Sequence, residues 1–247
     1  MDNKKLYQPP LMPQLLIEGL NRYHDQPCLF LGDKVATYRE VRERTSQLVQ
    51  ALQATGLGKG SRVAVISGNR PEVLANIAAM QLNGCIGTPL HPLGSLDDHA
   101  FVLEAAEIDA LIYDPTTFEE HASALQQRVP GVKHLLAFGP SAQGTDYLAL
   151  ADSFAPQPLV APDVSPEDIS SINFTGGTTG RPKGVMSSFR VTSYMTQIQL
   201  AEWEFPDDLR MLIATPLSHA AAAFFIPVLQ KGGAFYVMQG FSPDAFF

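Results

Sequence analysis

The sequence predicts an α/β protein with a mostly parallel sheet. Helical and strand-like stretches alternate along the chain, and the part between residues 62 and 138 runs strand, helix, helix, strand, helix, strand. This order favours parallel strands joined by right-handed crossovers. The composition, with 247 residues of which 45% are hydrophobic and 17% charged, excludes wholesale disorder and allows one large or two small domains.

The first part of the chain begins with a predicted hairpin whose turn is Gly32 and Asp33. Thr37 and Glu40 have the spacing of a capping box, which begins a long helix, and Gly56 follows as its left-handed terminator. The predicted strands of this part lie at residues 28–31, 35–37, 62–67, 110–114 and 134–138. The predicted helices lie at residues 37–54, 69–84, 95–106 and 116–128.

The second part of the chain follows a proline-rich connector. Residues 155–168 carry four prolines, which favours an irregular segment. The predicted elements after it are strand 169–174, a Gly/Thr-rich loop, helix 191–201, strand 211–215, helix 220–230, strand 234–238 and a final helix after Ser242. That helix has barely begun at Phe247, so we expect the chain to be the front part of a longer protein.

The charge and the cysteine content limit the functional classes to which this protein can belong. Lys and Arg number 17 against 25 Asp and Glu, a net charge of −8, which argues against a dedicated nucleic-acid binder. Cys28 and Cys85 are too few for a disulfide framework and are predicted to be reduced core thiols. The sequence shows no metal-ligand spacing, signal core or membrane-spanning stretch. We expect a cytoplasmic protein with at most peripheral membrane contact.

The loop after the predicted strand 169–174 carries the chemistry. From Thr175 to Gly184 it has the sequence Thr-Gly-Gly-Thr-Thr-Gly-Arg-Pro-Lys-Gly. Glycines allow the backbone to approach a ligand, and successive N–H groups in such a turn form an anion-binding nest. Three threonine hydroxyls can donate to phosphate oxygens, and Lys183 adds a positive charge. The loop therefore predicts a site for a polyphosphate.

Other interpretations of this loop fit less well. The P-loop pattern fails because Gly180 is followed by Arg181, with Lys183 further on and no Ser or Thr beside it. The dinucleotide fingerprint G-x-G-x-x-G is absent from the sequence. The remaining alternative is a glycine-rich surface loop without a function. The ordered composition of Thr, Gly and Lys argues against it.

The loop resembles the signature phosphate loop of the adenylate-forming enzymes, which include acyl-CoA synthetases, luciferases and nonribosomal adenylation domains. Gly176 stands where the family usually has Ser or Thr, a variant associated with fatty-acid–CoA ligases. Further motifs similar to those of the family lie in order at residues 37–40 with 58–64, 81–89, and 215–219 with 231–233. The closest likeness is to bacterial fatty-acid–CoA ligases.

The resemblance implies a two-step reaction that uses ATP, Mg²⁺ and coenzyme A. A fatty carboxylate attacks the α-phosphorus of ATP and pyrophosphate leaves, after which the thiol of coenzyme A displaces AMP. By resemblance, the residues that hold the β- and γ-phosphates are Thr175, Gly176, Gly177, Thr178, Thr179, Gly180 and Lys183. Thr178 is the threonine expected near Mg²⁺. The family's adenine motif, catalytic lysine and small C-terminal domain are expected beyond Phe247, so we expect this chain alone to be inactive.

His219 matches the family's gating residue at the acyl pocket, which is expected to shift between the two steps. The competing interpretation is a core or capping histidine, and the sequence around it favours the gate. Residues 220–225 are predicted either to line an apolar tunnel or to pack as an ordinary helix. The other histidines, including His91, are given no catalytic role.

The resemblance also refines the architecture to two stacked α/β subdomains. One is expected at residues 59–200 with the phosphate loop, and the other at 1–58 plus 201–247, incomplete here. An incomplete sheet leaves an apolar edge exposed, so we expect the chain to self-associate. Three alternatives remain open: a non-catalytic scaffold, an aryl-CoA ligase, and an acyl-AMP ligase or adenylation domain of the same family.

Overall fold

The computed structural model describes residues 8–175 and 181–246. Its strands are β1 (Pro27–Leu31), β2 (Lys34–Thr37), β3 (Arg62–Ile66), β4 (Ile86–Pro89), β5 (Ala110–Tyr113), β6 (His134–Ala137), β7 (Thr145–Asp146), β8 (Ile169–Thr175), β9 (Lys183–Ser188), β10 (Arg210–Ile213) and β11 (Ala234–Val237). Its helices are α1 (Met12–Arg22), α2 (Tyr38–Ala54), α3 (Pro71–Leu82), α4 (Leu96–Ala105), α5 (Pro115–Arg128), α6 (Tyr147–Asp152), α7 (Phe189–Glu202), the 3₁₀ helix η2 (Ala220–Phe224), α8 (Phe225–Gln230) and α9 (Pro243–Phe246).

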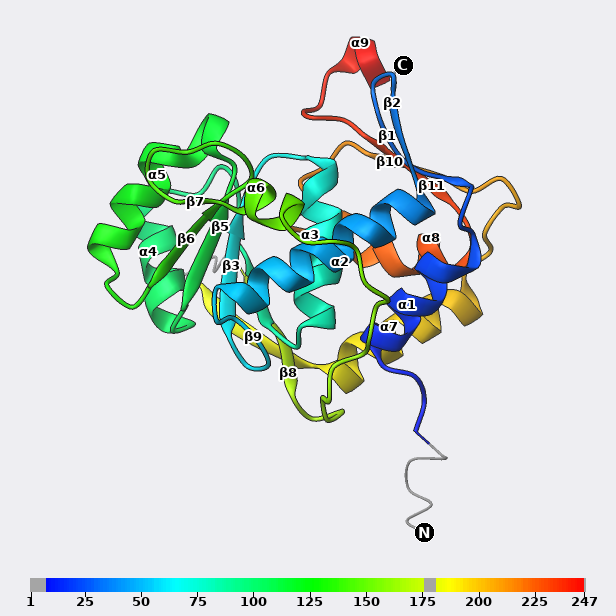
Figure 1. Ribbon diagram of the computed structural model, residues 1–247, viewed down its shortest axis with the longest axis horizontal. Coiled ribbons are helices and arrows are strands. Elements are labelled where there is room, and N and C mark those ends of the chain that lie inside the picture. The colour runs from blue at the N-terminus through cyan, green and yellow to red at the C-terminus, as the bar shows by residue number, and fades with distance from the viewer. Residues whose placement is uncertain (1–7, 176–180, 247) are drawn as a thin grey trace.

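The described strands form two sheets, which confirms the predicted α/β class. The larger sheet has the order β7-β6-β5-β3-β4-β8-β9 and the smaller has the order β10-β11-β1-β2. Neighbours in the larger sheet are parallel, except that β9 runs antiparallel to β8. Helices α2 and α3 lie between the two sheets, and α4 and α5 cover the far face of the larger one (Figure 1).

Each face of the larger sheet has its own core. Along β3, Val63 packs into the core between the sheets, and the next residue, Ala64, packs into the core under α4 and α5. This alternation follows from the two-residue period of a strand. The interior strand β5 is buried at all four positions, as expected for a parallel strand covered on both faces.

The predicted hairpin and capping box are confirmed. Strands β1 and β2 pair antiparallel around Gly32. At the start of α2, the Thr37 backbone N–H donates to Glu40 Oε2 at 2.7 Å, and Glu40 N–H donates to Thr37 Oγ1 at 3.3 Å. Gly56 follows the helix with a φ of 79°, the left-handed conformation that a side chain disfavours.

Three strands of the larger sheet, β4, β7 and β9, were not predicted. Strand β4 has four residues and includes Gly87 and Pro89, which are poor strand formers, so its formation depends on its parallel neighbours β3 and β8. The prediction that the phosphate loop leads directly into a helix is wrong. Strand β9 comes first and α7 begins at Phe189. Because β9 is an edge strand exposed at most positions, it carries no alternating hydrophobic signal.

The predicted helix at residues 220–230 is two elements. A 3₁₀ turn, η2, is followed by α8, in which Pro227 is the third residue. Proline lacks a backbone N–H and favours the first turn of an α-helix, so it fits a helix that starts at Phe225 better than one that starts at Ala220. The sequence patterns also did not identify α1, α6 or β7.

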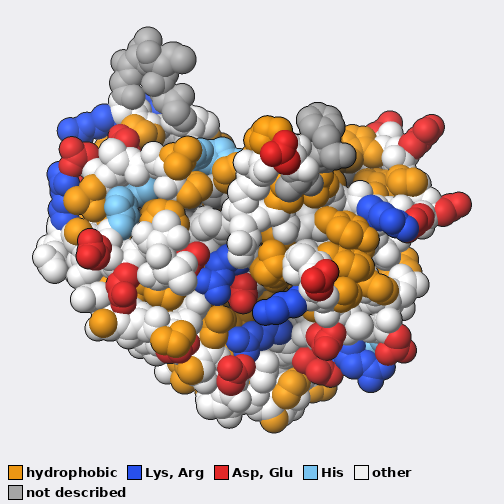
Figure 2. Space-filling view, turned by 90° about the horizontal axis from the view of Figure 1, so that it is seen from above, with side chains coloured by type: hydrophobic (Ala, Val, Ile, Leu, Met, Phe, Trp, Pro, Cys, Tyr) orange, Lys and Arg blue, Asp and Glu red, His pale blue; other side chains and the backbone are white. Residues whose placement is uncertain are grey.

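Both cysteines are free and buried, as predicted. Burial raises the pKa of the Cys85 thiol to about 12, so this group stays protonated near neutral pH. In the described residues, no helix is long and apolar enough to cross a membrane. Figure 2 shows histidine side chains on the half of the surface that carries the larger sheet, and many hydrophobic side chains on the other half.

Candidate functional site

The predicted phosphate loop joins β8 to β9 at one edge of the larger sheet. Thr175 ends β8 and Lys183 begins β9, and the two are cross-strand partners. Thr175 Oγ1 donates to the Lys183 carbonyl at 3.5 Å, and both residues are exposed. The structure therefore brings these two predicted site residues together. Gly176, Gly177, Thr178, Thr179 and Gly180 lie outside the described residues.

Both ends of this loop meet the same aromatic side chain, Phe101 of α4. The Phe174 ring lies edge-on to Phe101 with centroids 6.4 Å apart. On the other side of the loop, the Arg181 guanidinium lies 5.3 Å from the centroid of the Phe101 ring, a cation–π contact. Phe101 thus holds the two ends of the loop at one place. Sequence reasoning missed it because an isolated phenylalanine on a helix signals only core packing.

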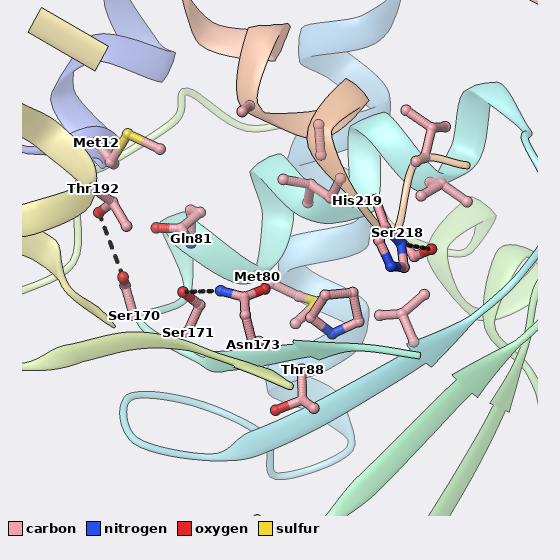
Figure 3. Close-up of a pocket in the computed structure, with 18 of the residues that line it drawn as sticks. Met12, Met80, Gln81, Thr88, Ser170, Ser171, Asn173, Thr192, Ser218 and His219 are labelled. Atoms are coloured by element: carbon pink, nitrogen blue, oxygen red, sulfur yellow. Dashed lines mark hydrogen bonds between the residues drawn. The ribbon is translucent and has the colours of Figure 1, made fainter. Parts of the chain in front are cut away.

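A cavity of about 300 Å³ lies between one face of the larger sheet and the helices above it. Strands β3, β4 and β8 form its floor, and α3 with the segment that leads into η2 forms its roof (Figure 3). Its lining residues from the segment before and within η2 are Leu217, Ser218, His219, Ala222 and Ala223. Of the residues predicted for an apolar tunnel, two alanines line the cavity. In contrast, Phe225 is buried in the core.

The floor of this cavity is made of small residues. A Cβ added to Gly87 of β4 would lie 3.1 Å from Met80 Cε of α3, so a side chain here would push into the cavity roof. Asn173 of β8 also lines the floor. Because residues two apart on a strand share a face, Thr175 lies one step further along the same face as Asn173. The phosphate loop therefore begins where the cavity ends.

His219, directly before η2, lines the cavity. Its Nδ1 lies 2.9 Å from Ser218 Oγ. The His91 ring meets it edge to face, with centroids 4.7 Å apart. Burial lowers the pKa of His219, and the charge that His91 can carry lowers it further. His219 is therefore neutral near pH 7, and its imidazole acts as a polar group without charge.

His91 lies beside His219 in the structure, although no sequence pattern indicated a role for it. The Leu93 backbone N–H donates to His91 Nδ1 at 3.1 Å, which restricts the orientation of the exposed ring. The His91 carbonyl accepts from His99 Nε2 at 2.9 Å, and His99 Nδ1 in turn accepts from His121 Nε2 at 2.8 Å. Three scattered histidines thus join β4, α4 and α5 to the site. Because these histidines are separated in the sequence, no sequence motif indicated this arrangement.

Asn69 fixes the segment that carries His219. Its Nδ2 donates to the carbonyls of Thr215 and Met238, both at 3.0 Å, and its Oδ1 accepts from Leu217 N at 2.9 Å. Asn69 is buried at the end of β3, so it links the larger sheet to the ends of β10 and β11 in the smaller one. In the sequence it stood out only as the start of a helix. No local sequence pattern indicated that Asn69 would link the two sheets.

The chain matches the family model for AMP-binding enzymes over residues 17–247. It is 46% identical over 235 residues to a medium/long-chain-fatty-acid–CoA ligase, FadD8, of Mycobacterium tuberculosis. It is 33% identical over 218 residues to a feruloyl-CoA synthase of Amycolatopsis. These matches cover 93% and 87% of this chain, whereas the chain spans 41% of the length of each relative.

Solved structures agree with this likeness. The amide bond synthetase McbA of Marinactinospora thermotolerans superposes with a TM-score of 0.83 at 26% identity, covering 96% of this chain and 46% of McbA. A long-chain-fatty-acid CoA ligase structure from Rhodopseudomonas palustris, described there as putative, has a TM-score of 0.86 at 23% identity and covers 98% of this chain and 60% of that one. At that identity the second match shows the fold alone. Since the family model spans most of its length, the chain belongs to the AMP-binding enzyme family.

Proposed function

We propose that this chain is part of an ATP-dependent acyl-CoA synthetase that activates a medium- or long-chain fatty acid. The observation that carries the proposal is the closeness of two candidate subsites: the loop proposed to bind phosphate begins at Thr175, two residues after Asn173, which lines a largely apolar cavity of about 300 Å³. A carboxylate whose apolar tail lies in the cavity is thereby placed next to the phosphates of ATP. The relative with 46% identity is a fatty-acid–CoA ligase, which favours this substrate class over aromatic acids.

The phosphate loop is proposed to hold the β- and γ-phosphates through Thr175, Gly176, Gly177, Thr178, Thr179, Gly180 and Lys183. Lys183 and Arg181 supply positive charge beside the loop, and the hydroxyl of Thr175 is exposed there. Charge that develops on the departing pyrophosphate is stabilised by such groups. The first step forms an acyl–phosphate bond as the bond to pyrophosphate breaks. In the second, the thiol of coenzyme A displaces AMP.

Mg²⁺ is proposed to accompany ATP, with Thr178 as the nearby protein hydroxyl. In the described ranges, no group of three or more His, Cys, Asp or Glu side chains could hold a metal ion. A threonine hydroxyl is an oxygen ligand of the kind that Mg²⁺ accepts beside nucleotide phosphates and water. When bound, the ion would neutralise phosphate charge.

His219 is proposed as the gate between the cavity and the nucleotide side. It lines the cavity and lies on the segment that Asn69 ties to the sheet. A neutral imidazole can turn about its χ angles at low electrostatic cost, since no charge has to be moved between environments. We therefore propose that it closes the cavity during adenylation and moves aside for thioester formation.

The division of the chain is proposed to follow the two sheets, with one subdomain at residues 59–200 and the other at 1–58 plus 201–247. Exposed hydrophobic residues on α7 lie at helical spacing and form an apolar stripe, at Val191, Tyr194, Met195 and Ile198. We propose that the chain by itself associates with a second copy through this stripe. Buried free thiols at Cys28 and Cys85 support a reducing, cytoplasmic location.

The proposed function is tested by assaying the gene product that contains this chain with a panel of carboxylates, ATP and coenzyme A. Thioester formation is expected with alkanoates, and Lys183→Met is expected to lower kcat/KM about a hundredfold by removing phosphate stabilisation. Lys133→Met is the matched control, because Lys133 is also exposed but lies at the far end of the sheet before β6. Activity on benzoates alone, or unchanged activity in Lys183→Met, would contradict the proposal.

The same assay on the 247-residue chain tests whether it is active alone. We propose that it forms no acyl-adenylate at a useful rate. Hydroxamate trapping of the activated acyl group is the measurement, and ATP-dependent hydroxamate from a fatty acid would overturn this part of the proposal.

A further inference from the structure

The cavity next to His219 has polar groups at both ends and apolar groups between. Met80, Ile77 and the two alanines of η2 line its middle. Figure 3 shows Ser218 and His219 on one side, and Gln81, Ser170, Ser171 and Thr192 gathered on the other. An unsubstituted alkyl tail would place hydrocarbon against the polar side chains gathered on this second side.

The chain direction of the strands and of α3 shows which end of the cavity is remote from the candidate phosphate loop. Strands β3, β4 and β8 are parallel, and the phosphate loop follows the carboxyl end of β8. Helix α3 connects β3 to β4, so it runs back from the carboxyl ends of these strands toward their amino ends. Val73 lies in its first turn and Gln81 in its last, about 12 Å apart at 1.5 Å per residue. Gln81 is therefore remote from the loop and from the position proposed for the carboxylate.

Gln81 differs from Ser171 and Thr192 at that end because its side-chain carbonyl oxygen has no partner in the described part of the chain, as is also true of the Ser67 and Thr88 hydroxyls elsewhere in the cavity lining. Its Oε1 is buried and has no hydrogen-bond partner among the described residues. In contrast, Ser171 Oγ accepts from Asn173 Nδ2 at 3.2 Å, and Thr192 Oγ1 donates to the Ser188 carbonyl at 3.2 Å. A buried acceptor left without a partner costs about 1–3 kcal/mol. Something other than these residues is needed to satisfy it.

A hydroxyl group fits this requirement. The terminal torsion of glutamine is broad, so the carboxamide can turn its oxygen or its nitrogen toward the cavity. A hydroxyl can donate to the oxygen or accept from the nitrogen. A charged group at the same place would lose its hydration without an opposite charge to pair with, so it is disfavoured.

We propose that the acid bound in this cavity carries a hydroxyl group at the end remote from its carboxylate, and that the Gln81 carboxamide binds that hydroxyl. The inference rests on the proposed function and names the substrate class of the same site. An ω-hydroxylated alkanoate and a para-hydroxylated phenylpropenoate share this chemistry. Gln81 is then a specificity-determining residue, not a catalytic one.

The test measures kcat/KM of the gene product that contains this chain for ω-hydroxydecanoate against decanoate, and for para-hydroxycinnamate against cinnamate. In at least one pair the hydroxylated acid is expected to be favoured about tenfold, because its analogue leaves the carboxamide unsatisfied. The pair that shows the preference identifies whether the hydroxyl is carried by an alkyl chain or a ring.

Gln81→Met keeps the length of the side chain and removes its hydrogen-bonding groups. In this variant the preference is expected to fall to about twofold or less, because kcat/KM for the hydroxylated acid drops when the carboxamide can no longer bind the hydroxyl. Gln127→Met is the matched control, a glutamine on the exposed face of α5 outside the cavity, and should keep the wild-type preference. Thermal unfolding of each variant verifies that it is folded.

The outcomes separate the two proposals. Equal use of hydroxylated and plain acids, or a preference that survives in Gln81→Met, overturns the hydroxyl proposal and leaves the acyl-CoA synthetase assignment standing. Absence of thioester with every acid, hydroxylated or not, contradicts the assignment itself.

Discussion

The imidazole rings of His91 and His219 meet edge to face, with centroids 4.7 Å apart and planes inclined by 85°. His91 follows β4 and His219 precedes η2, so this contact joins the end of a strand in the larger sheet to the segment that carries the proposed gate. The charge that His91 can carry also lowers the pKa of His219. His91 is thus a positioning residue for His219.

Replacing His91 by Phe should raise the pKa of His219. The variant keeps an aromatic edge against the imidazole and removes the charge that His91 can carry, which is the smaller of the two causes that lower this pKa. Burial remains, so the pKa should stay below the ordinary value. NMR titration of the histidine ring protons measures it, with His24→Phe as a control at an exposed site. An unchanged or lower pKa would contradict the coupling.

Acidification should destabilise the histidine network of α4 and α5. Burial lowers the pKa of both His99 and His121 below the ordinary imidazole value. Below about pH 6.5 the unfolded state therefore binds more protons than the folded state, and stability falls as the pH drops toward the lowered values. The melting temperature should fall between about pH 7.5 and about pH 5.5. In His121→Gln it should fall less, because one titrating ring is gone, whereas His24→Gln should match the wild type.

Gly94→Ala should disturb the same network by steric overlap. A Cβ on Gly94 would overlap His99 Nε2, which is buried and donates to the His91 carbonyl. We expect a loss of about 1–3 kcal/mol in the free energy of unfolding, measured by urea denaturation. Gly58→Ala is the matched control, since a Cβ there would meet nothing within 4 Å. Equal stability of the two variants would show that His99 moves aside freely.

Asn69→Ala should destabilise the link between the sheets. The change removes all three hydrogen bonds of the carboxamide and leaves the buried Leu217 N–H and the carbonyls of Thr215 and Met238 without these partners. A loss of about 2 kcal/mol or more is expected in urea denaturation. Asn21→Ala, at an exposed position on α1, should change stability by less than about 0.5 kcal/mol. A loss no larger than that of the control would contradict the role of Asn69.

Self-association of the chain should depend on the apolar stripe of α7. Met195 lies in its centre and is 57% exposed, so Met195→Glu places a charge where a second copy is proposed to bind. Light scattering should show a lower average mass for this variant. Val160→Glu changes a residue that is 76% exposed in the connector before β8, and should leave the mass unchanged. A monodisperse monomer of the wild-type chain would contradict the proposal.

Much of the fold could be predicted because its signals are local. The capping box of α2 joins Thr37 to Glu40, three residues apart, and the glycine that ends the helix follows directly. Strands β3, β5 and β6 are short apolar runs, and β8 leads into the Gly/Thr/Lys loop. The candidate phosphate loop could be singled out for the same reason, because the residues proposed to bind phosphate lie within ten consecutive positions.

The features of the fold and of the candidate site that could not be predicted depend on contacts between distant parts of the chain. Strand β4 contains Gly and Pro and forms because two neighbouring strands pair with it. Asn69 bonds to Leu217, 148 positions away, and His91 meets His219 across a similar distance. The sequence by itself determined the α/β class, the capping box of α2 and its terminating glycine, and the candidate phosphate loop. Only the tertiary structure decided the cavity, its polar far end and the histidine pair, because each is formed by side chains that folding alone brings together.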